Sequence, residues 1–261
     1  MARTFVVSGS ASGIGQVTCQ LLEERGDKVI GIDVHNADVV ADLSSPDGRR
    51  EAVEKTIDIS NGKIDVLIAN AGLALPISKT VSVNFFGVTD LVLGLRATLA
   101  KSASPRVVIT SSMASLMPND SELVDLMLKL DEKAAVARAD VLVEQGGGLE
   151  QLIYGSSKRA ISRWIRKVAA TPEFAGAGIP VNAIGPGIVS TPMTKDMIAT
   201  DEAKARLLQV VPMPLNGIME PKVIANALIW LGREDNTHMT GQTIYIDGGA
   251  DVVLRGDDIW T

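Results

Sequence analysis

Cysteine, histidine and aromatic residues are scarce in this chain. Cys19 is the one cysteine among 261 residues, which excludes a disulfide framework within the chain, and its place in an apolar helical pattern predicts a small core residue. The two histidines, His35 and His238, are far apart and belong to no ligand-spaced cluster, so the sequence predicts no metal site. No apolar run reaches the roughly 20 residues that a membrane span requires.

An excess of positive charge is also missing. The net charge is −6 and the pI is about 5.0, which gives no electrostatic basis for binding nucleic acid. The first predicted strand begins close to Met1 with no signal peptide before it, so we expect a cytoplasmic protein without membrane contact. Hydrophobic residues make up 46% of the chain but aromatic residues only 3%. Such a core of Ala, Val, Leu and Ile suits helices layered on a parallel sheet.

The first strong motif is a short strand followed by three glycines. Residues 4–7 form an apolar, β-branched run, and Gly9, Gly13 and Gly15 follow before a helical pattern begins near Ile14. Glycine lets an anion approach the backbone, and the N–H groups at a helix N-terminus hold its charge. The spacing Gly-x-x-x-Gly-x-Gly therefore predicts a pyrophosphate site, although three glycines so close together also occur in ordinary turns.

A carboxylate follows at the distance that a dinucleotide site requires. The second predicted strand, residues 28–33, ends in Asp33, about 20 residues after the glycine turn, where a carboxylate accepts hydrogen bonds from the adenosine ribose. The alternative is a solvated acid at the end of a strand. The glycine turn upstream favours ribose binding.

Strand and helix patterns alternate along the chain. We expect strands at residues 4–7, 28–33, 38–41, 65–69, 106–111, 180–184 and 243–246, and helices at 14–24, 46–55, 81–100, 151–170 and 220–231. This predicts right-handed βαβ units and an α/β fold: one domain, residues 1–261, with a doubly wound (Rossmann-type) seven-stranded parallel sheet and helices on both faces. The apolar residues at helical spacing in residues 118–148 predict a helical insertion of two short helices. Residues 194–213 predict a mobile apolar lid, or else a segment packed on the body or on a partner subunit.

Tyr154 and Lys158 are four residues apart in a predicted helix, so they share one face. A phenol has an ordinary pKa of about 10 and becomes an efficient acid–base group when that pKa falls toward neutrality. An ammonium about 5 Å away favours the phenolate by roughly 3 kcal/mol, or about two pK units, at an effective dielectric constant of about 20. Ser112 follows the carboxyl end of a strand, where its hydroxyl can polarise a carbonyl oxygen. Taken singly, such a pair is more often structural and such a serine is more often a turn residue.

These motifs occur in one order from Thr4 to Gly249, together with Asn70-Ala71-Gly72, Asn84 and Pro186-Gly187, and the whole resembles the short-chain dehydrogenase/reductase family. The resemblance implies that Tyr154 is the acid–base group and that Ser112 steadies the substrate oxygen. It further implies that Lys158 binds the nicotinamide ribose and tunes Tyr154, and that Asn84 holds the water of a proton relay.

The resemblance also implies a set of cofactor-binding residues. Asn70 is similar to a family residue that steadies the sheet, Asp42-Leu43 matches the adenine contact, and Ile188 and Thr191 align with the carboxamide anchors. The full implied set is Gly9, Ser12, Gly13, Ile14, Gly15, Asp33, Val34, Asp42, Leu43, Asn70, Ala71, Gly72, Tyr154, Lys158, Pro186, Gly187, Ile188 and Thr191.

Two features depart from the ordinary family pattern. Ser112 and Tyr154 are 42 positions apart, more than in most members, because residues 118–148 lie between them. Together with Gly31-Ile32-Asp33, this insertion resembles the bacterial 3α-hydroxysteroid dehydrogenase/carbonyl reductase branch. The resemblance implies a homodimer or homotetramer, but the family's usual dimer interface uses the helices that flank the insertion, so the oligomer stays open.

The leading interpretation is an NAD(H)-dependent oxidoreductase that interconverts a secondary alcohol and a ketone, with a bulky apolar, alicyclic or steroid-like small molecule as substrate. One alternative is an NADPH-dependent ketoacyl reductase of the same fold. It is disfavoured because Asp33 would repel a 2′-phosphate and no Lys or Arg lies at residues 10–12 or 34–36. The other alternative is a catalytically silent dinucleotide sensor, which has no need of Asn84, Ser112, Tyr154 and Lys158.

Overall fold

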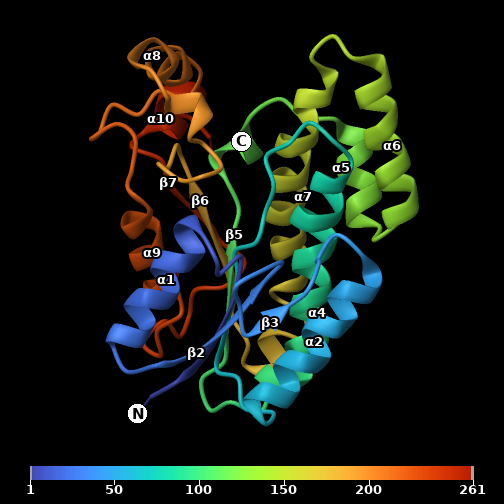
Figure 1. Cartoon of the computed structure of the whole chain (residues 1–261), viewed down its shortest axis with the longest axis vertical. Coiled ribbons are helices and arrows are strands. Elements are labelled where there is room, and N and C mark those ends of the chain that lie inside the picture. Colours follow the sequence, from blue (N-terminus) through green and yellow to red (C-terminus); the bar gives the residue numbers. More distant parts are fainter. Residues whose placement is uncertain (1, 260–261) are drawn as a thin grey trace.

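The computed structural model describes residues 2–259, which are built on one seven-stranded parallel sheet (Figure 1). The strands are β1 (Thr4–Ser8), β2 (Lys28–Asp33), β3 (Val39–Val40), β4 (Val66–Ala69), β5 (Arg106–Thr110), β6 (Val181–Pro186) and β7 (Thr243–Ile246). Their order is β3-β2-β1-β4-β5-β6-β7, so the predicted doubly wound α/β fold is confirmed. The direction of winding reverses between β1 and β4, the point at which open parallel sheets bind ligands.

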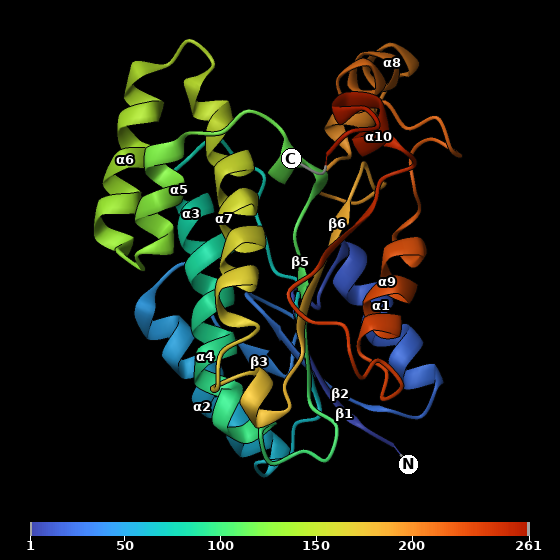
Figure 2. The same cartoon turned by 180° about the vertical axis from the view of Figure 1, so that it is seen from behind.

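Helices cover both faces of the sheet, as Figures 1 and 2 show from opposite sides. On one face α1 (Gly13–Glu24) packs against α9 (Pro221–Leu231). The other face carries α2 (Pro46–Ser60), α4 (Gly87–Leu99) and α7 (Leu152–Val168). Two further helices follow the carboxyl ends of the last strands: α8 (Asp201–Val210) and α10 (Ala250–Arg255).

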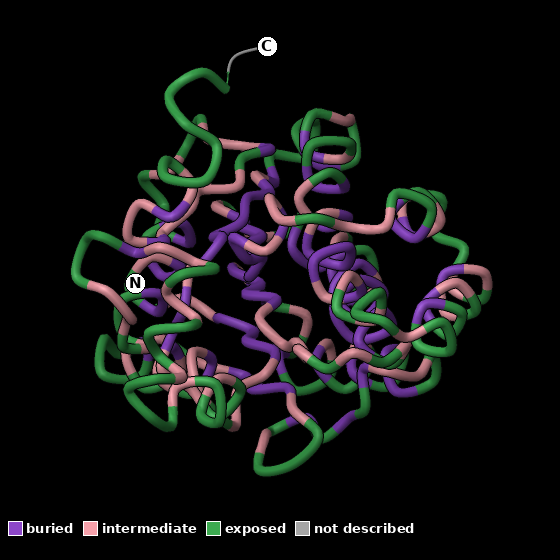
Figure 3. The backbone as a smooth tube through the Cα atoms, turned by 90° about the horizontal axis from the view of Figure 1, so that it is seen from above, coloured by how far each residue is buried: buried purple, intermediate pink, exposed green. Residues whose placement is uncertain are grey.

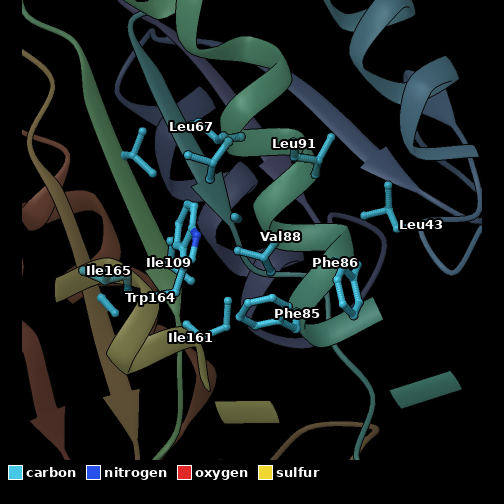
Figure 4. Packing of buried hydrophobic residues seen from close by; sticks show 14 of the residues in the cluster. Leu43, Leu67, Phe85, Phe86, Val88, Leu91, Ile109, Ile161, Trp164 and Ile165 are labelled. Carbon is cyan, nitrogen blue, oxygen red and sulfur yellow. The ribbon is translucent and has the colours of Figure 1, made fainter. Parts of the chain in front are cut away.

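The core lies on both faces of the central strands. In β1 the side chain of Val6 belongs to the cluster under α2, α4 and α7, whereas its neighbours Phe5 and Val7 belong to the cluster under α1 and α9. This alternation follows from the two-residue period of a strand. Figure 3 shows the buried centre, and Figure 4 shows Leu67 and Ile109 of the sheet beside Trp164 of α7. Cys19 is half-buried against the α1/α9 cluster, so it is a small core-side residue but not an enclosed one.

Residues 118–148 form two short helices, as predicted. They are α5 (Ser121–Leu128) and α6 (Glu132–Gln145), and they form an extra layer outside α7 (Figure 2). Each is capped by an aspartate: the Asp120 carboxylate accepts from the Leu123 N–H at 2.7 Å and the Asp131 carboxylate from the Ala134 N–H at 3.0 Å.

Two helices differ from the sequence-based expectation. α2 continues to Ser60, beyond the predicted end at Lys55, and stops where Asn61 turns into the left-handed region at φ 52°. The helix expected over residues 81–100 is interrupted. It begins as α3 (Lys79–Val81), passes through a π-helical turn (Ser82–Phe86) and continues as α4. Asn84 lies in the π turn, which is the kind of helix defect often found at functional sites.

Candidate active site

A cavity of about 510 Å³ opens at the carboxyl ends of the strands, and its floor is the glycine turn after β1. Gly9 and Gly13 have φ values of 71° and 54°, as an anion-binding turn requires. A Cβ atom on Gly9 would lie 2.9 Å from the Ala71 Cα, and one on Gly15 would lie 1.9 Å from the Gly9 carbonyl oxygen. Gly15 therefore shapes the turn from behind, whereas Gly9, Ser12, Gly13 and Ile14 line the cavity.

Asp33 stands at the end of β2 on the wall beside this turn. One carboxylate oxygen accepts from the Ala11 N–H at 2.9 Å and the other from the Val34 N–H at 2.7 Å, so the loop and the strand fix its orientation. Asp33 and Val34 both line the cavity. Each carboxylate oxygen has capacity for another donor, as a ribose hydroxyl would supply.

The next part of the wall is the segment Asp42-Leu43, which also lines the cavity. It is packed so closely on α2 that a Cβ on Gly48 would lie 2.1 Å from the Asp42 carbonyl oxygen. The Asp42 carboxylate accepts from the Ser44 N–H at 2.9 Å and pairs with Lys79 at 3.4 Å; the bonds to Ser44 and this lysine lower the pKa of Asp42. Lys79 lines the cavity, and the sequence analysis did not identify it.

Asn70, Ala71 and Gly72 lie where β1, β4 and β5 end together. The Ser8 hydroxyl accepts from the Asn70 and Ala71 N–H groups at 3.0 and 3.1 Å, and the Thr110 hydroxyl donates to the Asn70 side-chain oxygen at 2.9 Å. Asn70 thus joins three strand ends. The sheet-steadying role that the resemblance implies for it stays a prediction. All three residues line the cavity.

Ser112, Tyr154 and Lys158 meet in the same cavity. β5 delivers Ser112, and one turn of α7 separates Tyr154 from Lys158, whose Nζ lies 5.8 Å from the centre of the Tyr154 ring. The Lys158 side chain is buried, and its ammonium donates to the Thr110 carbonyl at 2.9 Å. Burial lowers the pKa of Lys158 from its ordinary 10.5 to about 8.

The expected fall in the pKa of Tyr154 is wrong for the protein without its cofactor. Burial raises the pKa of this phenol above its ordinary 10, and the opposing effect is a hydrogen bond with the Ser112 hydroxyl. The Lys158 ammonium is itself desolvated and bound to the Thr110 carbonyl, and it does not outweigh the effect of burial on the phenol. A positive charge added to the cavity would lower the pKa of the Tyr154 phenol toward neutral pH.

Asn84 lies behind the cavity wall and does not line the cavity. Its side-chain oxygen accepts from the Leu73 N–H at 2.7 Å, and its amide nitrogen donates to the Leu73 carbonyl at 2.9 Å and to the Ser157 hydroxyl at 3.0 Å. These bonds occupy both amide donors. A Cβ on Gly72 would lie 3.2 Å from the Asn84 oxygen and 3.6 Å from Lys158 Nζ, so the missing side chain leaves a gap between these two polar groups.

The turn after β6 completes the cavity. Pro186, Gly187 and Thr191 line it as expected, but Ile188 does not. The Ile188 side chain is buried, and its N–H points to the Met213 sulfur at 3.2 Å. The neighbouring residue, Val189, lines the cavity in its place.

Several other residues line the cavity without having been predicted as individual site residues. Thr110 and Ser111 were detectable as the end of a predicted strand, whereas the apolar residues carry no local signal. The additional lining residues are Ile32, Ala41, Leu73, Leu75, Lys79, Val83, Thr110, Ser111, Val189, Pro192, Met193 and Thr194.

Residues 194–213 contain α8 (Asp201–Val210) and, before it, a short 3₁₀ turn at Asp196–Ile198. Their inner side chains, Leu207, Leu208 and Met213 among them, pack on Met113 and Ile188 at the end of the sheet. Met193, just before the segment, is 47% exposed and lines the cavity mouth, whereas Met197 is 50% exposed and does not line it.

The turn that follows Ser112 is held by two other elements. The Tyr245 hydroxyl of β7 lies 2.8 Å from the Ser115 hydroxyl, and the Arg159 side chain of α7 donates to the Ser115 carbonyl. Ser115 itself is buried. Within residues 2–259 no group of three or more metal-ligating side chains comes together, and no helix is long and apolar enough to cross a membrane.

The comparisons with known proteins agree with this geometry. A family model described as enoyl-(acyl carrier protein) reductase matches residues 9–251. The 3-alpha-hydroxysteroid dehydrogenase/carbonyl reductase of Comamonas testosteroni is 34% identical, over 96% of this chain and 97% of its own. The chain belongs to the short-chain dehydrogenase/reductase family.

Other members of this family are also similar to this chain in structure or in sequence. The crystal structure of a 3-alpha-hydroxysteroid dehydrogenase from Pseudomonas sp. B-0831, complexed with NADH, superposes with a TM-score of 0.89 at 34% identity, covering 98% of this chain and 100% of that one. The 3-oxoacyl-[acyl-carrier-protein] reductase FabG of Thermotoga maritima is 27% identical over 95% of this chain and 97% of its own. As a member of this family the protein is an oxidoreductase that acts on small molecules.

Proposed function

We propose that this protein is an NAD(H)-dependent oxidoreductase that interconverts a secondary alcohol and a ketone, with Tyr154 as the acid–base group. One observation carries the proposal. Ser112, Tyr154 and Lys158 line the same cavity as Asp33 and the glycine turn, so the reacting groups and the dinucleotide elements share one space. The relatives named for hydroxysteroid dehydrogenase activity, and the NADH in one of their structures, support it.

The residues present fit a dinucleotide. The backbone of Gly9, Ser12 and Gly13 would hold the pyrophosphate at the N-terminus of α1, and Asp33 would accept from the adenosine ribose. Lys158 would donate to the nicotinamide ribose. When bound, the cofactor supplies hydride-transfer chemistry at the end of the cavity nearest Ser112 and Tyr154.

In the direction of reduction, the Ser112 hydroxyl donates a hydrogen bond to the carbonyl oxygen of the substrate and holds it near the Tyr154 phenol. The phenol then gives its proton to that oxygen, and in oxidation the phenolate takes it back. The positive charge of Lys158 would stabilise the negative charge of the phenolate. The gap beside Gly72, between Asn84 and Lys158, is where a water would reconnect the lysine to solvent.

The substrate that we propose is bulky and apolar. Apolar side chains besides the residues assigned to the cofactor line the cavity, among them Leu73, Leu75, Val83, Val189 and Met193. A steroid-like or alicyclic ketone would remove these side chains from water together with its own rings. In Figure 1, α8 and the insertion stand on either side of the carboxyl ends of the strands.

Cofactor choice gives the first test. Asp33 repels a 2′-phosphate, no arginine is among the described residues that line the cavity, and Lys79 is already paired with Asp42. We expect kcat/KM for NADH to exceed that for NADPH by at least about 100-fold, or roughly 2.7 kcal/mol, with a cyclic ketone as substrate. Asp33→Ala should narrow the gap, mainly by weakening NADH. Equal use of both cofactors by the natural protein would contradict the proposal and favour an NADPH-dependent ketoacyl reductase.

A further inference from the structure

A single buried arginine joins the insertion to the nucleotide end of the cavity. Arg49 of α2 is 2% exposed, and its guanidinium donates to the Asp90 carboxylate of α4 at 2.6 Å. It also makes a two-pronged pair with the Glu132 carboxylate at the start of α6, one prong being Nη1 to Oε1 at 3.1 Å. The same Nη1 donates to the Leu43 carbonyl at 3.2 Å.

Leu43 is the part of this network that reaches the cavity. Its side chain is buried and belongs to the same hydrophobic cluster as Phe86 and Leu91 (Figure 4). A Cβ on Gly87 would lie 3.3 Å from the Leu43 Cβ, so α4 presses closely on this segment. The carbonyl of Leu43 is thus held by α2 while its side chain is held by α4.

Glu132 fixes the position of the Arg49 guanidinium. It binds Nη1 and Nη2 together, whereas Asp90 binds Nε alone. A buried guanidinium that loses its two-pronged partner has unpaired donors, which is costly, so it moves toward a new acceptor or toward solvent. Because Nη1 bridges Glu132 and Leu43, such a movement also removes the donor from the Leu43 carbonyl.

We propose that the Glu132–Arg49 pair is a positioning device by which the insertion fixes the Leu43 wall and thereby sets the affinity of the protein for the adenosine half of its cofactor. The inference rests on the proposed function in one respect, that a dinucleotide binds in this cavity. It gives the insertion a role in cofactor binding. Glu132 and Arg49 do not line the cavity, so they act through Leu43.

The test is calorimetric binding of AMP and of NADH to the natural protein and to Glu132→Gln. We expect the dissociation constant for AMP to rise about fivefold to tenfold, and that for NADH to rise by the same factor, since the loss is confined to the adenosine half. The change also removes one negative charge, which by itself would strengthen the binding of an anion. Weaker binding of AMP by Glu132→Gln would therefore result from the displaced Leu43 wall and not from the lost charge.

The matched control is Glu122→Gln, which removes the same charge from the insertion at an exposed ion pair with Arg138. It should leave both dissociation constants within about twofold. If Glu132→Gln does not fold, as its melting curve will show, Glu132→Asp keeps the charge and shortens the reach, and the same rise for AMP is expected.

A folded Glu132 variant that binds AMP as the natural protein does would overturn the inference and leave the pair a purely structural link. An NADH affinity that falls much further than the AMP affinity would also overturn it, because the whole cavity would then have loosened. Failure of the natural protein to bind AMP or NADH at all would instead remove the proposed function on which the inference rests.

Discussion

Tyr154 is buried in surroundings that favour its neutral, protonated form. Burial raises the pKa of this phenol, and it also raises the pKa of Tyr245, the other tyrosine of the chain. The proton that a ketone oxygen needs is therefore retained at neutral pH until charge develops nearby. As the proposed acid–base group, Tyr154 would thus be ready to donate its proton, and its deprotonation would depend on what binds in the cavity.

This gives a prediction for the protein without cofactor. Phenolate absorbance at 295 nm should appear only above pH 10 for both tyrosines. Saturating NAD⁺, with its positively charged ring, should lower one midpoint and leave the other in place, and Tyr154→Phe should abolish the midpoint that moves. A phenolate midpoint near pH 8 in the cofactor-free protein would refute this description of the site.

Lys158 makes the stability of the fold depend on pH. Its pKa is about 8 in the folded protein and about 10.5 in the unfolded chain, so between these values the unfolded state binds more protons. The destabilisation from burying this charge is fully present below pH 8 and is relieved as pH rises toward 10.5. The buried position of the side chain makes this effect large.

Urea denaturation of the natural protein and of Lys158→Met at several pH values measures this contribution of Lys158 to the free energy of unfolding. The free energy of unfolding of the natural protein minus that of the variant should grow by roughly 2–3 kcal/mol from pH 7 to pH 10. Taking this difference removes the contributions of the other groups that titrate in this pH range, because both proteins contain them. A difference that stays constant or shrinks with pH would show that Lys158 is not held in a low-pKa environment.

Residue-level prediction succeeded where chemistry and spacing act locally. Tyr154 and Lys158 share a helix face because they are four apart, and Ser112 reaches the cavity because it follows a strand end. Ile188 does not line the cavity, whereas its neighbour Val189 does, and the carboxamide contact implied for Ile188 stays a prediction. The hydrogen bond from the Ile188 N–H to the Met213 sulfur is a contact across 25 positions, which no local pattern encodes.

At the scale of elements, the segment after β6 is the one that we expect to select substrates by size. The apolar side chains of this segment fall into two groups. Leu207 and Leu208 of α8 pack on Met113 and Ile188, whereas Met193 lines the cavity. Methionine adapts to varied apolar shapes. The prediction that residues 194–213 act as a lid stays a prediction, and Met193 is now its better probe.

Substrate size tests the lid. Each further 100 Å² or so of apolar surface buried should contribute about 2.5 kcal/mol before ordering costs, so KM should fall from small to large cyclic ketones. Met193→Ser should raise KM most for the largest ketone, whereas Met197→Ser, exposed and outside the cavity lining, should have little effect. Higher kcat/KM for small keto acids than for cyclic ketones would show that no apolar lid operates.

Elements were predictable where the hydrophobic period is regular. The strands have both faces buried and read as short apolar runs, and the insertion helices carry aspartate caps. The π turn around Asn84 was not predictable, because the Asn84 amide within it bonds to Leu73 and Ser157, and no local pattern encodes these contacts. Helix ends such as Ser60 depend on one residue, Asn61, adopting a left-handed conformation.

At the scale of the whole molecule, alternation of strand and helix determined the sheet, and the sheet determined the site. Parallel strands connected by right-handed crossovers bring their carboxyl ends to one edge, so Gly9, Asp33, Asn70 and Ser112 meet although they are distant in sequence. The Arg49–Glu132 connection was invisible in the sequence because the two residues are 83 positions apart. The homo-oligomer that the resemblance implies stays a prediction.

The central claim is that Tyr154 supplies the proton for NADH-dependent ketone reduction. The most direct measurement is turnover of the natural protein and of Tyr154→Phe with NADH and the best cyclic ketone, alongside the dissociation constant for NADH. The account predicts a fall in kcat of at least about 100-fold, within the range of roughly 10²–10⁴ for general acid–base groups, with NADH binding changed by less than about twofold. Turnover of the variant within about threefold of the natural protein would contradict it.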